Sequence, residues 1–247
     1  MKRHMLIGPA ILLLCWITVT SGGIVRPLFL PSPKAVGAAL YTLTWSGPLG
    51  ADVGTTLFRT GVSFAISAVV GLCIGLPLGI WKSVYRSLEI VLDFFRSLPS
   101  PAIIPLAMLV LGLGDASRIF VAAFTCSLIN AVQTAYAISS IPRHRVLAAR
   151  LSGAHRFFLV KNVLLPSVMP GVIAGWRITL SLSLIIIVVT EMFIGTRSGL
   201  GMRIYDFHLM FRSAEMYSYI IVVGTTGYLL NKGIETAEKR LVHWAGK

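Results

Sequence analysis

The sequence predicts an all-α integral membrane protein with about six transmembrane helices. Of its 247 residues, 55% are hydrophobic and only 13% are charged, and the mean hydropathy is +0.81. A soluble domain carries roughly 25% charged residues, so this chain has too few polar side chains to cover a water-facing surface. A lipid-facing surface needs no charge, and a helix satisfies its own backbone hydrogen bonds there. The apolar runs therefore predict membrane-spanning helices.

The first apolar run, Met5 to Thr20, follows a short basic N-terminus. This arrangement is typical of either a signal peptide or a first span. We expect an uncleaved helix, because residues 21–23 make a poor cleavage site and further apolar runs follow. Residues 22–52 contain prolines at a density that breaks helices. They predict an external loop with one short helix from Pro33 to Trp45.

Five further spans are expected, and an amphipathic interfacial helix, Leu88 to Phe95, leads into the short third span. The expected spans are Val53–Trp81, Ala102–Leu113, Arg118–Ser139, Val172–Phe193 and Tyr217–Leu230. Nothing outside the apolar runs is long enough to fold alone, so we expect one transmembrane domain over 1–247. Its parts are the first span and external loop (1–52), the core spans (53–235) with a loop at 141–166, and a tail (236–247).

The cations gather in the short segments between the apolar runs. The formal net charge is +13 and the pI is about 10.2, which in a soluble protein would suggest nucleic-acid binding. Basic loops beside apolar spans are instead what the positive-inside rule expects. With the N-terminus inside, the inner segments hold roughly twice as many cations as the outer ones. We therefore expect no nucleic-acid partner, and both termini in the cytoplasm.

The basic segment 143–166, between spans four and five, contains no acid. It predicts a short helix, a glycine hinge, a second short helix, and a proline, Pro166, that starts the next span. Ala148 and Ala149 present little side chain, and Gly153 can adopt the left-handed conformation that ends a helix. A small-residue surface of this kind allows the groove of another protein to close over it. The residues alone leave open whether the loop docks a partner or only fixes topology.

The same segment resembles the cytoplasmic loop of ABC-importer permeases, whose pattern is Glu-Ala-Ala, three residues, Gly, and an apolar-Pro step. The matching residues are Leu147-Ala148-Ala149, Gly153 and Leu165-Pro166. Further blocks resemble the nitrate, sulfonate and taurine branch of this family, at 30–33, 95–106, 112–120 and 191–201. The chain departs from the pattern at one position, because Leu147 stands where the family has glutamate.

The resemblance implies a type I ABC-importer permease fold with a cytoplasmic coupling helix between spans four and five. It implies a multi-pass protein of the bacterial cytoplasmic membrane, a second permease copy forming a homodimer, cytoplasmic ABC ATPase subunits and an external solute-binding protein. The coupling residues would be Leu147, Ala148, Ala149, Gly153 and Pro166. The cargo would be a small solute, with nitrate, a sulfonate, taurine, bicarbonate and a pyrimidine precursor all open.

Polar side chains inside the spans need an explanation, since a charge at mid-bilayer costs roughly 2.5–3.5 kcal/mol. Asn130 and Gln133 share a helix face, and either line a pathway or bond a neighbouring span. Glu191, near the outer end of span five, either pairs with a cation such as Arg197 or belongs to an outer gate. Arg96 is expected near the inner boundary, with a structural role or a place in the pathway.

No catalytic, metal or cofactor site is expected. The five histidines lack ligand spacing, the acids are too scattered for a paired-carboxylate enzyme, and no phosphate-binding glycine loop is present. A partner must therefore supply any ATPase. A self-sufficient secondary transporter or channel is the alternative, but it would show internal repeats or acids placed for ion coupling. A membrane-embedded enzyme would need more clustered ionisable groups than this sequence has.

Overall fold

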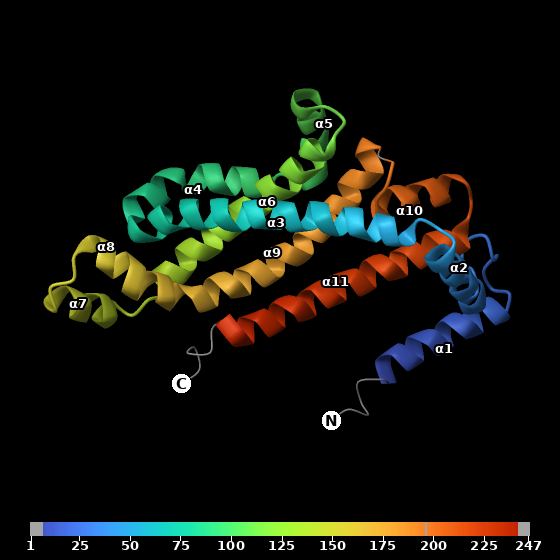
Figure 1. Ribbon diagram of the computed structural model, residues 1–247, viewed down its shortest axis with the longest axis horizontal. Coiled ribbons are helices and arrows are strands. Elements are labelled where there is room, and N and C mark those ends of the chain that lie inside the picture. Colours follow the sequence, from blue (N-terminus) through green and yellow to red (C-terminus); the bar gives the residue numbers. More distant parts are fainter. Residues whose placement is uncertain (1–6, 196, 242–247) are drawn as a thin grey trace.

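The computed structural model describes residues 7–195 and 197–241, and these ranges are helical throughout, without strands (Figure 1). This confirms the predicted fold class. The first helices are α1 (Ile7–Ser21), α2 (Pro33–Trp45), α3 (Leu49–Ile80), α4 (Lys82–Ser97), α5 (Ser100–Leu111) and α6 (Asp115–Ser139). They are followed by α7 (Arg143–Leu151), α8 (Arg156–Leu159), a π-helical segment (Val160–Leu164), α9 (Leu165–Ile194), α10 (Leu200–Leu209) and α11 (Ser213–Leu241).

Among the residues that the structure describes, three helices are long and apolar enough to cross a membrane: α3, α6, and the continuous helix Phe157–Ile194, which contains α9. The pair α4 and α5, bent by 92°, forms a fourth candidate if it counts as one span. The predicted spans near the two ends of the chain, α1 and α11, do not meet the same criteria of length and apolar character. Helix α1 has 15 described residues, or about 22 Å at 1.5 Å per residue, and α11 is long but more polar. The chain thus runs back and forth between two ends of the molecule (Figure 1).

Helices α3 and α6 form the closest pair, and glycines on α3 allow it. A Cβ added at Gly71 would lie 2.3 Å from the Cβ of Asn130, and one at Gly75 would lie 2.5 Å from the carbonyl oxygen of Ala131. Both distances are too short for any side chain. The backbones therefore approach as closely as small residues permit, which is a common way to pack helices in a bilayer.

Helix α4 differs from the predicted interfacial helix. It runs back along α6, with Tyr85 beside Tyr136 (ring centroids 6.5 Å apart) near its start and Phe95 against Phe124 (5.8 Å) near its end. The chain then breaks at Pro99, which disfavours a helical conformation in the residue before it. If the bent pair is one span, that third span begins at Lys82 and its second half is α5.

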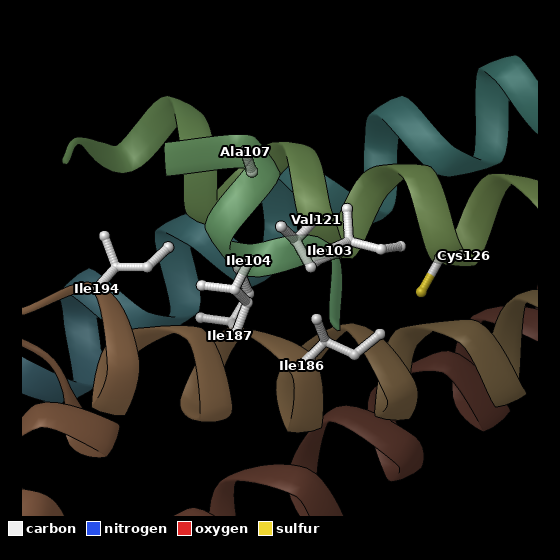
Figure 2. Close-up of a cluster of buried hydrophobic side chains, with 9 residues drawn as sticks. Ile103, Ile104, Ala107, Val121, Cys126, Ile186, Ile187 and Ile194 are labelled. Atoms are coloured by element: carbon white, nitrogen blue, oxygen red, sulfur yellow. The ribbon is translucent and has the colours of Figure 1, made fainter. Parts of the chain in front are cut away.

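Helix α5 is held by a buried apolar cluster after the 92° bend. Figure 2 shows isoleucines of α5 and α9 meeting small and branched residues of α6. The cluster consists of Ile103, Ile104, Ala107, Val121, Ala122, Cys126, Ile186, Ile187 and Ile194. Packing on two helices at once fixes the direction of α5, and Cys126 serves there as a small apolar side chain.

Candidate functional site

The loop between α6 and α9 has the predicted order of helix, glycine hinge and helix. Helix α7 ends with the amide of Ala154 donating to the carbonyl of Ala149 (3.1 Å) and the amide of Gly153 donating to Arg150 (3.0 Å). Gly153 has φ +80°, a left-handed conformation that costs roughly 1–2 kcal/mol in other residues. Gly153 thus sets the angle between α7 and the following helix.

The loop presents apolar side chains at one end of the molecule, beyond the last turns of α3 and α6 (Figure 1). Leu147 is 59% exposed, and Leu151 and Phe157 are exposed as well. Beside Leu147, the short side chains of Ala148 and Ala149 project little from the helix backbone. An open groove of about 590 Å³ lies between α7 and the ends of α3 and α6, and Leu147 lines it. Exposed apolar residues on a basic element are typical of a protein-docking surface.

Pro166 lies in the first turn of α9, as predicted, but the helix axis does not break before it. One helix continues from Phe157 to Ile194, and the π-helical segment lies just before the proline. There the amide of Leu165 donates to the carbonyl of Val160, five residues back. A π-turn is a common accommodation of a helix irregularity, and it is often found at functional sites. The loop therefore continues directly into the long helix that carries Glu191.

A buried ion cluster lies at the opposite end of the molecule, around Glu191. The Glu191 carboxylate is fully buried and accepts hydrogen bonds from Arg59 Nη1 (2.7 Å), Thr56 Oγ1 (3.0 Å) and the amide of Gly201 (2.9 Å). A Cβ at Gly199 would lie 2.6 Å from the Glu191 carboxyl carbon. Only glycine therefore fits at position 199 beside this carboxylate. The three hydrogen-bond donors replace the water that the carboxylate loses when it is buried.

A second buried carboxylate, Asp52, holds the same turn. It accepts from the amide of Gly199 (2.9 Å), from Arg203 Nε (3.0 Å) and from the Tyr219 hydroxyl (2.8 Å). Asp52 and Glu191 thus both bind backbone amides at the start of α10, where the unpaired amides of a helix and its dipole favour negative charge. This fixes α10 against α3, α9 and α11.

Two arginines join α6 to the cluster through Asp115. Its carboxylate accepts from Arg59 Nε (2.9 Å) and from Arg118 Nη1 (2.7 Å). Arg118 also donates to the carbonyl of Gly195, and Arg59 Nη1 to that of Ser198 (2.9 Å). We name Asp52, Thr56, Arg59, Asp115, Arg118, Glu191 and Arg203 the outer ion cluster. It connects α3, α6, α9 and the turn before α10.

The partner that the sequence suggested for Glu191 is wrong. Its cation is Arg59, whereas Arg197 is exposed on the rim of an open cavity of about 700 Å³ beside the cluster. Arg59 was missed although it lies within an apolar run. A cation in a span needs a partner, and that signal would have marked Arg59 as a residue to explain, though not which acid it meets.

Asn130 bonds two neighbouring helices. Its side chain donates to Ser67 Oγ on α3 (3.2 Å) and accepts from Thr179 Oγ1 on α9 (3.0 Å). This geometry supports the interhelical alternative. Gln133 is half-buried, and its Cβ would lie 3.2 Å from a Cβ added at Gly175 on α9. The shared face of α6 thus packs against α9.

Arg96 lies beside the middle of α6. It follows Phe95, which packs against Phe124. Phe124 lies about 22 Å along α6 from Ser139, at 1.5 Å per residue. Arg96 is therefore far along α6 from the loop end of that helix, with its side chain 39% exposed and paired to Asp93 at 3.3 Å.

Taken together, the fold and the two sites are those of a helical protein built to lie in a membrane. Its helices connect an exposed basic loop at one end to a buried ion cluster at the other (Figure 1). No group of three or more histidine, cysteine or acidic residues within the described ranges could hold a metal ion.

The chain belongs to the family of binding-protein-dependent transport system inner membrane components, whose model matches residues 67–238. It is 30% identical to a probable ABC transporter permease protein of Brucella melitensis, over 93% of this chain and 92% of the relative. It is 32% identical to the nitrate import permease protein of a Synechocystis species (94% and 86%). It is 27% identical to the taurine transport system permease protein of Escherichia coli (96% and 88%).

The fold is similar to that of a chain in inward-facing structures of the MetNI methionine ABC transporter. The TM-score is 0.71 at 24% sequence identity, over 83% of this chain and 98% of that one. The resemblance noted in the sequence is thus confirmed, and so is the type I importer permease fold. The chain is a permease subunit of an ATP-driven ABC importer, not an enzyme, and such a subunit works with an ATPase and a binding protein.

Proposed function

We propose that the loop 141–166 is the element through which this permease is driven by its ATPase. The observation that carries the proposal is the continuous helix from Phe157 to Ile194, which joins the exposed loop directly to the outer ion cluster. A displacement of the loop by a nucleotide-driven partner would be passed along this helix to Glu191. Nucleotide binding would thereby shift the chain between two states through contacts that differ between them.

The loop end is then the cytoplasmic end, and both termini lie in the cytoplasm of a bacterial cell whose inner membrane holds the chain. The positive-inside bias of the sequence supports this orientation. Two copies form a homodimer with the pathway between them. An external binding protein delivers the solute at the end that carries α2 and α10. In the coupling loop, Leu147 contributes an apolar contact where the family pattern has an acid, so the groove of the ATPase is expected to be apolar there.

The cargo we propose is a small anion. The support is the cargo for which two relatives are named, nitrate and taurine, whose sulfonate group is anionic, together with the arginines that line the outer cavity. Arg59, Arg118 and Arg197 contribute to that cavity, against the single acid Asp115. An excess of positive charge in a cleft raises the local concentration of anions and rejects cations.

Purification of the chain with and without its partners tests this function. We expect the detergent-extracted chain alone to hydrolyse no ATP, and to co-purify with an ABC ATPase that becomes active in the complex. Addition of the loaded binding protein should raise hydrolysis several-fold. Uptake driven by an ion gradient, with no ATPase bound, would contradict the proposal and favour a self-sufficient secondary transporter.

A further inference from the structure

Helix α4 carries all its charged residues on one face. At 100° per residue, Lys82, Arg86, Glu89, Asp93 and Arg96 fall within an arc of about 80°. We name these five residues the charged stripe. Each of them is exposed in the single chain. The stripe runs for most of the helix, about 24 Å for its 16 residues.

The other two faces of α4 are apolar and differ in their surroundings. Leu92 is buried against α6, and Phe95 packs on Phe124 beside it. Ile90 and Phe94 are 82% and 61% exposed, as expected of side chains that face lipid. The charged stripe is therefore a separate face, flanked by protein on one side and by a lipid-type surface on the other.

Lipid cannot cover the charged stripe, because each charge at mid-bilayer costs roughly 2.5–3.5 kcal/mol. A dry contact with a second copy is also unfavourable. A two-fold axis would bring identical stripes together, and burying several charges without full pairing costs several kcal/mol per ion. Water between the stripes removes both penalties.

We infer that the charged stripe of α4 lines an aqueous translocation pathway, and that Arg96 is its deepest contact for a small anion. The inference rests on the proposed permease function and assigns the pathway to one helix face. Within the described ranges, the Arg96 guanidinium makes one hydrogen bond, to Asp93 at 3.3 Å. A guanidinium has five N–H donors in a planar fork, so most of them can bind an anion in transit.

Thiol labelling tests the inference without any ATPase, so its failure is distinguishable from failure of the permease function. The full chain is reconstituted into vesicles after replacement of Cys15, Cys73 and Cys126. Single cysteines are then placed in adjacent pairs at equal depth: Glu89→Cys with Ile90→Cys, and Asp93→Cys with Phe94→Cys. A small water-soluble thiosulfonate is the probe. We expect the stripe position of each pair to react at least tenfold faster than its lipid-facing neighbour.

Equal protection at Asp93→Cys and Phe94→Cys would overturn the inference, as would rapid disulfide formation between two copies at Asp93→Cys without labelling. A second arm uses the complex with its ATPase and binding protein. Arg96→Gln should lower anion uptake at least tenfold, and Arg96→Lys should restore part of it. Unchanged uptake in Arg96→Gln would remove the anion contact from the stripe.

Discussion

Replacement of Arg59 by methionine is expected to destabilise the protein by about 3–5 kcal/mol, because it leaves the Glu191 carboxylate buried without its cation. Arg59 is the only charged donor to Glu191 that the described part of the chain shows, at 2.7 Å, and it also pairs with Asp115. The remaining donors, Thr56 and the amide of Gly201, are neutral. Thermal or denaturant unfolding in detergent measures the change.

Two further variants separate the buried pair from a general effect of removing an arginine. Arg212→Met breaks an exposed pair with Glu215, which should cost no more than about 1 kcal/mol. Arg59→Met combined with Glu191→Gln removes both charges and should recover at least about 1 kcal/mol relative to Arg59→Met alone. A single Arg59→Met variant as stable as the parent protein would contradict the assignment of a buried ion pair.

Replacement of Gly153 by tryptophan is expected to lower uptake by the assembled importer at least tenfold while the chain still inserts. A Cβ at Gly153 meets no atom within 4 Å, so the folded chain has room for the side chain. The left-handed φ of +80° costs a non-glycine residue roughly 1–2 kcal/mol, and the ring would fill the surface on which an ATPase closes. Uptake into vesicles and co-purification of the ATPase are the measurements.

Gly23→Trp is the matched control for this loop. Gly23 also has a left-handed φ, +65°, with no atom within 4 Å of an added Cβ, but it lies beyond the end of α1. The same backbone penalty is therefore imposed far from the loop. Normal uptake in Gly153→Trp, or equal loss in both variants, would contradict a specific coupling role for the loop.

Sequence reasoning predicted the elements whose signals are local. The short external helix Pro33–Trp45 was predicted with the bounds that the structure shows, because Pro33 is favourable at a helix start and Ser32 caps its first turn. The helix–glycine–helix order of the loop was predicted from Gly153 for a similar reason. Both depend on conformational preferences of a few neighbouring residues.

Features that depend on distant contacts were not predicted. The direction of α4 follows from ring contacts between Phe95 and Phe124, and the bend after Ser97 from packing of α5 on α6 and α9. The amphipathic pattern of α4 therefore suggested a membrane surface, although its charged face lies along the spanning layer. Likewise, Arg59 and Glu191 are far apart in the chain, and a single sequence does not say which cation a buried acid meets.

Photo-cross-linking from Ala149 tests the central claim most directly, since the claim is that α7 transmits force from the ATPase. A photoreactive side chain at Ala149 should capture the ATPase subunit in the assembled complex, whereas one at Leu113, exposed at the opposite end, should not. If the photoreactive side chain at position 149 captures no ATPase in a complex that still contains it, the loop is not the coupling element. The same holds if the thiol of Ala149→Cys reacts with an impermeant thiol reagent applied outside the cell.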